Sequence, residues 1–440
     1  MEILIKAIQF FLSLTLLVTV HEFGHFIVAR LFKIRVEKFY IFFDWGFSLF
    51  KLRRGETEYG LGWLPLGGYC KIAGMVDESL DTEGLKSEPK PYEFRAKPAW
   101  QRFFVLIAGV AMNVVLAFII YCGISYTWGN SYIANEDITL GYSFNEAGHT
   151  LGFEDGDRII SIDGEPIDNV AKITAAVLLA KENTEVVVLR NNEPQSFALL
   201  GEQLNPIRSD EANFVNFCTP RMPFIIDGIE SEEASSAGLQ CGDRIVGIDE
   251  VMEEDFFKYN ELLTARASQT AQLTVCRGAD TLTIAAPISA EGRLGVRVAQ
   301  SITPRHIDYS LWESIPAGAN LTVATIKNYW NQLKLIVQPD TGLYKQVGGF
   351  IAIGNIFPSE WNWLQFWSMT ALLSIILAVM NLIPIPGLDG GHTLFTLWEM
   401  VTRRKVSDRV LEIAQYIGLG LILALVLFAN GNDIYRFIFK

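Results

Sequence analysis

Four long apolar segments constrain the fold of this chain more than any other feature. They run over residues 3–31, 99–126, 364–383 and 410–429 of a 440-residue sequence in which 50% of residues are hydrophobic. A helix of about 20 predominantly apolar residues is long enough to cross the hydrocarbon core of a bilayer. The sequence therefore predicts a polytopic α-helical membrane protein with four transmembrane helices.

Basic residues gather at one set of ends of these segments. They are Arg30, Lys33, Arg35 and Lys38 after the first, Arg95, Lys97 and Arg102 around the start of the second, and Arg403, Arg404, Lys405 and Arg409 between the third and fourth. Because cytoplasmic loops carry an excess of Lys and Arg, we expect these ends in the cytoplasm and both termini, with residues 128–360, outside it. The net charge of −13 argues against a nucleic-acid surface.

The first segment contains the pentapeptide His21-Glu22-Phe23-Gly24-His25. Residues i and i+4 share a helix face, so two imidazoles can hold one Zn²⁺ with the carboxylate beside them. This is the H-E-x-x-H pattern of metallopeptidases, although a solvated helix can carry it by chance. Ionisable groups are costly at membrane depth and usually functional, which favours a metal site. A signal peptide is the alternative for this segment, but it has no basic n-region and no small-residue cleavage site.

The third segment runs into the stretch N-L-I-P-I-P-G-L-D-G-G-H, from Asn381 to His392. Pro384 and Pro386 cannot continue a regular helix, and irregular backbone at membrane depth borders protein or a water-filled cavity. Asp389 in this stretch caps the following helix in one interpretation. In the favoured one it is the third ligand of the metal that two histidines leave incompletely coordinated. His392 is a conceivable fourth ligand, but a role beside the ligands or toward solvent is preferred.

Residues 58–69 predict a strand, a turn and a second strand between the first two apolar segments. One interpretation is an interfacial β-hairpin with no role in chemistry. The other is an exposed strand edge around Gly60, Gly62 and Leu64 that pairs with an extended substrate. In the second apolar segment, Asn113 is expected to hydrogen-bond a neighbouring helix.

The long middle region contains an internal repeat, in which residues 151–164 align with residues 237–250. Each copy has Gly-Asp before an alternating run, followed by a helical pattern and another strand. The motif A-G-L-Q-C-G-D-R-I at residues 237–245 resembles PDZ domains. We therefore expect two extracytoplasmic PDZ-like α+β domains, at 127–221 and 222–303. One disulfide among Cys218, Cys241 and Cys276 is possible, and its connectivity stays open.

An amphipathic interfacial segment is expected at residues 304–360, before the third apolar segment. Trp361, Trp363 and Trp367 then form an aromatic belt of the kind found where a span enters the membrane.

Together, H-E-F-G-H, N-L-I-P-I-P-G-L-D-G-G, four spans and two PDZ-like domains resemble the site-2 protease family of intramembrane zinc metalloproteases. The resemblance covers nearly the whole chain and implies Zn²⁺ held by His21, His25 and Asp389, with Glu22 as the catalytic base. It also implies a membrane-reentrant hairpin that pairs with substrate. The residues expected to contact substrate are Asn381, Pro384, Pro386, Gly60, Gly62 and Leu64. One departure is Gly109-Val110, where the family commonly has Pro after the Gly.

The resemblance further implies a multi-pass protein of the cell inner membrane, with periplasmic PDZ-like domains and an active site near the cytoplasmic face. Residues 1–126 would carry H-E-x-x-H and the hairpin region 35–72, and residues 361–440 the N-x-x-P-x-P-x-L-D-G motif. Its substrates would be transmembrane segments of single-span proteins already trimmed outside, such as anti-sigma factors or signal-peptide remnants. The alternative is a non-catalytic PDZ-bearing membrane scaffold with a structural metal. A metal transporter would need several ligand clusters in series, and the sequence offers one.

Overall fold

The computed structural model describes residues 2–64, 67–75, 88–209, 213–214, 216–338, 343 and 347–439. The chain divides into two compact units, of which the first comprises Met1–Gly129, Asp308–Lys334 and Lys345–Lys440. The second comprises Asn130–Ile307 and Leu335–Tyr344. The first unit is therefore assembled from segments on both sides of a long insertion.

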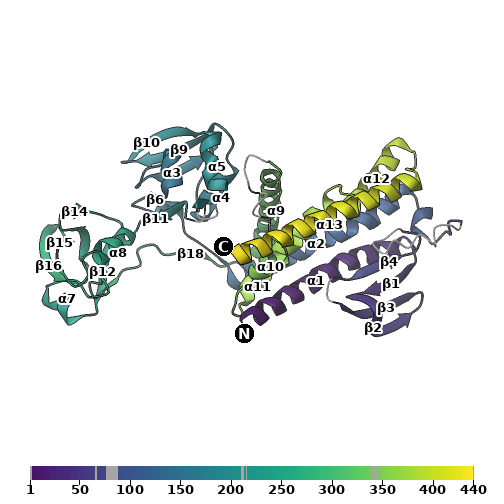
Figure 1. Ribbon diagram of the computed structural model, residues 1–440, viewed down its shortest axis with the longest axis horizontal. Coiled ribbons are helices and arrows are strands. Elements are labelled where there is room, and N and C mark those ends of the chain that lie inside the picture. The colour runs from purple at the N-terminus through teal and green to yellow at the C-terminus, as the bar shows by residue number, and fades with distance from the viewer. Residues whose placement is uncertain are drawn as a thin grey trace. The chain divides into compact units, whose positions relative to one another are not determined.

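Helices dominate the first unit (Figure 1). They are α1 (Glu2–Leu31), α2 (Ala99–Trp128), α9 (Leu311–Ile336), α10 (Phe350–Asn355), α11 (Trp363–Leu382), α12 (Asp389–Thr402) and α13 (Asp408–Phe439), with a short 3-10 turn at Phe94–Ala96. Within the described residues, α1, α2, α11 and α13 are long and apolar enough to cross a membrane. The first three coincide with the predicted segments to within two residues, and α13 covers the fourth and continues ten residues beyond it, so the prediction of a polytopic helical protein is confirmed.

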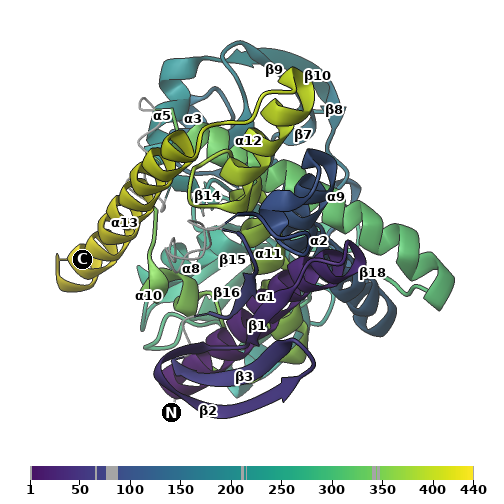
Figure 2. The same cartoon turned by 90° about the vertical axis from the view of Figure 1, so that its right-hand side faces the viewer.

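Helix α2 is the common neighbour of the helices around it, packing against α1, α11 and α12 (Figures 1 and 2). Small residues allow the close approach: Ala117 of α2 and Ala371 of α11 are both completely buried. On the other side of α2, a Cβ at Gly24 of α1 would clash with the carbonyl of Ala108 and lie 2.8 Å from Met112 Cγ. Small residues let helix backbones approach closely and pack well in a membrane, where water does not drive the helices together. Helix α2 thus holds the first and third spans together.

A four-stranded sheet follows α1, with strands β1 (Val36–Tyr40), β2 (Phe43–Arg54), β3 (Thr57–Leu64) and β4 (Tyr69–Ile72) in the order β2-β3-β1-β4. The hairpin joins β2 to β3 and turns after Arg54, which pairs with Thr57. The predicted hairpin over residues 58–69 is wrong in its pairing, because β3 and β4 do not pair with each other. Strand β1 lies between them, parallel to β3 and antiparallel to β4, and β4 is at the edge of the sheet. Buried Val36, Ile72 and Val105 pack this sheet into a core shared with α1 and α2.

Strand β2 carries a row of exposed apolar side chains. Trp45, Phe47, Leu49 and Phe50 are 58–80% exposed, and the Phe47 ring stacks on Trp63 of β3 at 5.6 Å. Monomeric proteins in water rarely expose such a contiguous apolar surface. This face of the sheet is suited to an apolar environment.

The second unit contains two sheets with separate hydrophobic cores. The first holds β7 (Arg158–Ile162), β8 (Glu165–Pro166), β9 (Thr184–Arg190) and β10 (Glu193–Leu199), with α3 (Glu146–Thr150), α4 (Ala171–Leu179), α5 (Gly201–Ser209) and the pair β6 (Tyr142–Phe144) and β11 (Cys218–Pro220). The second holds β12 (Phe224–Ile229), β13 (Arg244–Ile248), β14 (Val251–Met252), β15 (Thr270–Arg277), β16 (Asp280–Pro287) and β17 (Val296–Val298), with α7 (Glu232–Ser236) and α8 (Phe256–Thr264). Both sheets follow the order strand, short strand, helix, strand, strand. Their identification as PDZ-like domains stays a prediction.

Each half of the repeat contains an equivalent ion pair with a buried aspartate. Asp157 and Asp243 follow the repeated glycine, are 0% and 1% exposed, and accept two hydrogen bonds of 2.7 Å from Arg190 and Arg277 respectively. Burial alone would raise the pKa of Asp243, but the hydrogen bonds and charge of Arg277 hold that pKa below its ordinary value. The Gly-Asp of the repeat is thus a structural anchor.

The insertion begins and ends in adjacent strands. Strand β5 (Asn130–Tyr132) pairs antiparallel with β18 (Arg305–Ile307). All five cysteines lie in the described part of the chain, and none forms a disulfide. The predicted segment 304–360 contains α9, whose Ile326, Tyr329 and Leu333 pack on α2 and α11, while residues 339–342 and 344–346 lie outside the described residues.

Candidate metal centre

Helix α1 places His21 and His25 on one face, directed toward α2. Each histidine is 7% exposed. His25 Nδ1 lies 2.8 Å from the carbonyl oxygen of Val105. Because a carbonyl only accepts hydrogen bonds, His25 donates from Nδ1, and in the neutral imidazole the unprotonated Nε2 then faces the centre of the bundle. Glu22, the next residue along α1, lines the same cavity as both histidines.

The broken backbone after α11 brings Asp389 to these histidines. Helix α11 ends at Leu382 and α12 begins at Asp389, as the two prolines require. Gly390 packs on this connection, since a Cβ there would lie 2.7 Å from the carbonyl oxygen of Asn381. Further along α12, Glu399 accepts a 2.6 Å hydrogen bond from Arg102 of α2. Asp389 is thus held at the start of a helix that is anchored to α2.

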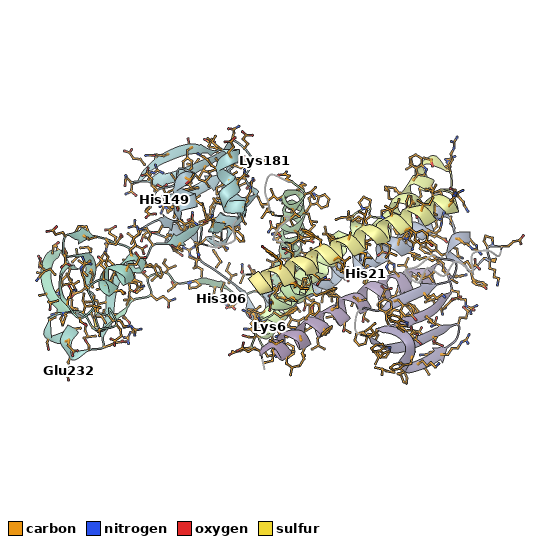
Figure 3. All side chains as sticks on the ribbon, in the orientation of Figure 1. Lys6, His21, His149, Lys181, Glu232 and His306 are labelled. Carbon is orange, nitrogen blue, oxygen red and sulfur yellow. The ribbon has the colours of Figure 1, made fainter. Side chains whose placement is uncertain are left out.

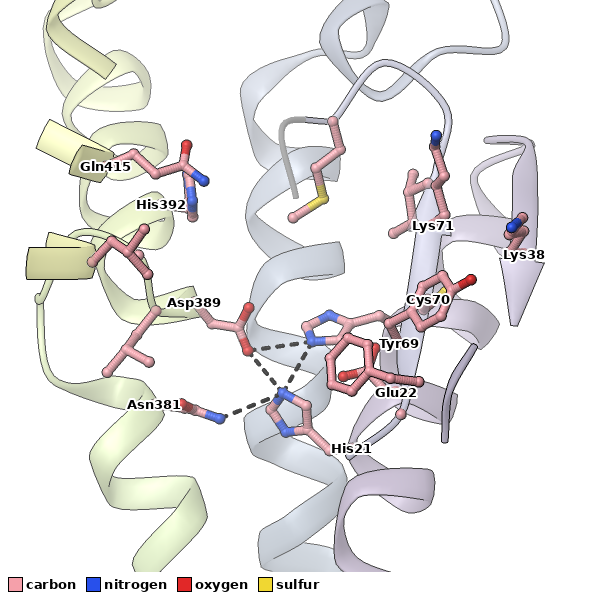
Figure 4. A pocket seen from close by; sticks show the side chains of 18 of the residues that line it. His21, Glu22, Lys38, Tyr69, Cys70, Lys71, Asn381, Asp389, His392 and Gln415 are labelled. Carbon is pink, nitrogen blue, oxygen red and sulfur yellow. Dashed lines mark hydrogen bonds and ion pairs between the residues drawn. The ribbon is translucent and has the colours of Figure 1, made fainter. Parts of the chain in front are cut away.

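Three potential ligand atoms converge (Figure 4). Asp389 Oδ2 lies 2.9 Å from His21 Nε2 and 3.2 Å from His25 Nε2, and the two Nε2 atoms are 3.2 Å apart. Asp389 Oδ2 is buried, and no described residue makes a hydrogen bond of good geometry to it. Nitrogen and oxygen ligands about 2.0–2.2 Å from a tetrahedral Zn²⁺ would lie roughly 3.3–3.6 Å apart, close to the spacing of these atoms. The side chains therefore fit a metal ion of the size and ligand preference of zinc.

The converging atoms border a cavity of about 680 Å³. Its polar lining residues are His21, Glu22, His25, Lys38, Asp44, Tyr69, Lys71, Asn381, Asp389, His392 and Gln415. Asn381 Nδ2 is 3.5 Å from His21 Nε2, so the predicted Asn381 does reach the centre. His392 lines the cavity too, but the group of side chains in the described residues that could hold a metal ion consists of His21, His25 and Asp389. The stretch with Pro384 and Pro386 contributes Gly387 and Leu388 to the wall, so the prolines act by bending the backbone.

The sheet side of the cavity differs from the prediction. Gly60, Gly62 and Leu64 belong to β3, which lies between β1 and β2 and so does not form an edge. The two glycines are needed for packing, since a Cβ would clash with the Tyr40 ring at the first and with the Phe43 carbonyl at the second.

The edge strand β4 contributes all four of its residues, Tyr69–Ile72, to the cavity lining, and Lys38 of β1 and residues 43–45 of β2 line it too. Its Tyr69 donates a 2.9 Å hydrogen bond to Asp44, and burial and that carboxylate raise the pKa of Tyr69. The phenol therefore stays neutral in the cavity wall at physiological pH.

Two residues of α2 adjoin the centre that sequence reasoning did not assign to it. A Cβ at Gly109 would lie 2.5 Å from His25 Nε2 and 2.6 Å from His21 Cε1, so only glycine fits beneath the imidazoles. The Asn113 amide lies 3.2 Å from His21 Nδ1. The sequence does show Gly109 and Asn113 on one face of an apolar helix, which indicates a contact there. It does not show that this face is turned toward the histidines of α1.

The other labelled histidines of Figure 3 have local partners in the second unit. His149 Nδ1 lies 3.1 Å from the Phe153 carbonyl oxygen. His306 Nδ1 lies 2.7 Å from the Ser131 hydroxyl. Neither belongs to the candidate metal-binding cluster found in the described residues.

Comparison with known proteins identifies the family. The model of peptidase family M50 matches residues 9–425. The Regulator of sigma E protease of Haemophilus influenzae is 29% identical over 453 residues, covering 97% of this chain and 98% of that protein. A protein of Neisseria meningitidis serogroup A whose name places it among zinc metalloproteases is 28% identical over 452 residues, covering 98% of each. Since the family match includes both the α1 histidines and Asp389, this chain belongs to peptidase family M50, the site-2 protease family of zinc-dependent metalloproteases.

Proposed function

We propose that His21, His25 and Asp389 bind the catalytic zinc and that Glu22 is the general base for hydrolysis of peptide bonds inside the membrane. The observation that carries this proposal is the convergence of three ligand atoms from α1 and α12 within a bundle of membrane-length helices. Three protein ligands leave a fourth position of a tetrahedral ion for water or substrate, as in catalytic zinc sites. The structural metal of a non-catalytic scaffold would instead have a closed ligand shell.

The chemistry follows from the residues that line the cavity. Bound zinc supplies Lewis-acid chemistry, which acidifies water and polarises a carbonyl group. Glu22 accepts a proton from the attacking water while the water oxygen bonds to the carbonyl carbon. The same carboxyl then gives that proton to the amine nitrogen as the C–N bond breaks. Asn381, close to His21, is placed to hydrogen-bond the substrate beside the reacting group.

A transmembrane substrate must lose its helical hydrogen bonds before its carbonyl groups become accessible. Unpaired backbone groups cost several kcal/mol each in the hydrocarbon core, so an unwound segment needs new partners. Strand β4 is an edge strand beside the cavity, and its outer backbone groups can pair with an extended substrate. We therefore assign the substrate-pairing edge to β4 in place of β3, and the exposed side chains of Phe47, Leu49 and Phe50 in β2 to contact with the bilayer.

The orientation of the chain follows from charge and depth. The basic clusters support an orientation with the ends of α1 and α11 that carry the site toward the cytoplasm. Both termini and the repeated sheet domains would then lie on the periplasmic side of the inner membrane. His21 lies roughly 27 Å along α1 from Ile3, near the cytoplasmic face. Single-span proteins already trimmed on the periplasmic side fit such an enzyme, with the PDZ-like pair excluding bulky outer domains.

Zinc content tests the ligand assignment. We expect purified His21→Ala and Asp389→Ala to lose the zinc that copurifies with the wild type. His392→Ala is the matched control, because this histidine lines the same cavity outside the ligand cluster and should leave zinc in place. Equal zinc in wild type and Asp389→Ala would overturn the assignment.

Cleavage tests the mechanism. In proteoliposomes, Glu22→Gln should lower cleavage of a trimmed single-span substrate by about 10²–10⁴-fold, the usual contribution of a general base. Glu2→Gln makes the same change at an exposed position of the same helix and should cleave normally. A substrate that keeps a folded outer domain should be cleaved poorly. Normal cleavage by Glu22→Gln would refute Glu22 as the general base, whereas absence of cleavage by the wild-type protein would favour the non-catalytic scaffold.

Cys70 of β4 allows the substrate conformation to be tested. Cysteines placed one at a time along the substrate segment should cross-link to Cys70 at alternate positions, because side chains of an extended strand repeat every two residues. A helical substrate would cross-link with a period near 3.6 residues. That second pattern would exclude pairing with β4.

A further inference from the structure

The environment of Asn113 links α2 to the chemistry of His21. Asn113 is completely buried, and its side-chain nitrogen lies 3.2 Å from His21 Nδ1. In this orientation the amide oxygen, Oδ1, is buried with no hydrogen-bond partner in the described part of the chain. The two ends of an Asn amide have nearly the same shape, so a half-turn of the amide exchanges them without moving the backbone.

The metal decides which end of the amide must face the ring. A neutral imidazole carries one proton, and a ring that binds zinc through Nε2 carries it on Nδ1. His21 Nδ1 is then a donor, and the amide nitrogen, also a donor, cannot satisfy it. His25 has the corresponding arrangement, with its Nδ1 at 2.8 Å from the Val105 carbonyl oxygen. Helix α2 would thus supply one acceptor to each zinc-binding histidine.

We infer that Asn113 is a positioning residue of the zinc site, which accepts the Nδ1 proton of His21 through its amide oxygen and so fixes the ring with Nε2 free for the metal. This inference rests on the proposed function of His21 as a ligand. Acceptors behind zinc-binding histidines fix the tautomer and ring orientation and raise ligand basicity. At the same level, where α2 contacts α11, Ser374 of α11 donates a 2.7 Å hydrogen bond to the backbone carbonyl of Asn113 and does not contact the amide side chain.

Zinc affinity, measured by competition with a chelator on the purified full-length protein, tests the inference without relying on activity. Asn113→Leu keeps a similar volume but offers no acceptor, and should bind zinc about 10–100-fold more weakly than wild type. Asn113→Asp offers only acceptors and should stay within about threefold of wild type, since carboxylates serve the same role in zinc sites. If the amide nitrogen were the group that mattered, the aspartate variant would fail as the leucine variant does.

Ser374→Ala is the packing control. It removes a hydrogen bond from the same level of the α2 and α11 contact without touching the imidazole, and should leave zinc affinity unchanged. Wild-type affinity in Asn113→Leu, a loss in Asn113→Asp equal to that in Asn113→Leu, or an equal loss in Ser374→Ala would each overturn the inference. If Asn113→Asp does not fold, the comparison of Asn113→Leu with Ser374→Ala decides alone. A wild-type protein that binds no zinc would instead refute the proposed ligand set.

Discussion

Replacing Gly109 by alanine is expected to disable the metal centre while leaving the bundle folded. The new Cβ would lie 2.5 Å from His25 Nε2 and 2.7 Å from His21 Nε2, whereas ordinary contact begins at 3.4 Å. The rings must therefore move by roughly 0.7–0.9 Å, and metal sites tolerate about 0.2 Å in their ligand distances. Misplacement by about 1 Å costs on the order of 10²-fold in rate, so we expect kcat/KM to fall about 10²-fold, together with zinc affinity.

The matched control is Gly123→Ala in the same helix. A Cβ at Gly123 has nothing within 4 Å, and alanine in place of glycine stabilises a helix by about 1 kcal/mol. Both variants should be purified, tested for zinc retention against a chelator and for cleavage of a trimmed substrate, and compared in thermal unfolding. If Gly109→Ala keeps zinc and turnover within about threefold of Gly123→Ala, the argument that α2 packs directly beneath the imidazoles is refuted.

Three further changes test how the rest of the molecule supports the site. Glu399→Gln weakens the partly buried contact with Arg102 that anchors α12, and should lower stability by about 1–3 kcal/mol in thermal unfolding. Arg102→Met should abolish this effect in a double-mutant cycle. Alanine at Gly418 of α13 would clash with the backbone carbonyl of Pro386, close to Asp389, and should slow cleavage. Gly420→Ala is the control and should cleave normally, because no described atom lies within 4 Å of its Cβ. Because its folded-state pKa is lowered, Asp243 stabilises its domain at neutral pH and loses this effect as the pH falls below about 4, so thermal unfolding of the full chain should show an acid-sensitive transition that Asp243→Asn reduces.

The local part of the site could be predicted from the sequence. The pair His21 and His25 follows from helical periodicity, and the break at Pro384 and Pro386 follows from proline chemistry. Asp389 was expected as the third ligand because a carboxylate at membrane depth needs a partner, and the structure places it beside both histidines. These are properties of single segments or of charge burial, which require no knowledge of the packing.

What depended on three-dimensional order could not be predicted. The glycines of β3 indicated a close contact with another part of the backbone. The sequence did not indicate that β1 lies between β3 and β4, which follow each other in the chain. Asn113 was expected to bond another helix, and it does, yet only the packing of α1 against α2 reveals that the partner is a ring nitrogen of His21. A polar residue in an apolar helix predicts a polar contact, but not the residue that makes it.

The two-stranded stem of β5 and β18 has a consequence for how such a chain can be divided. Tyr132 pairs directly with Arg305, so the insertion leaves and returns at one point. A two-residue turn is enough to join paired antiparallel strands. Replacement of residues 133–304 by such a two-residue turn would therefore keep α2 and α9 connected. The helical unit and the two sheet domains are in this sense separable parts of the chain, and we expect zinc binding to persist after this excision.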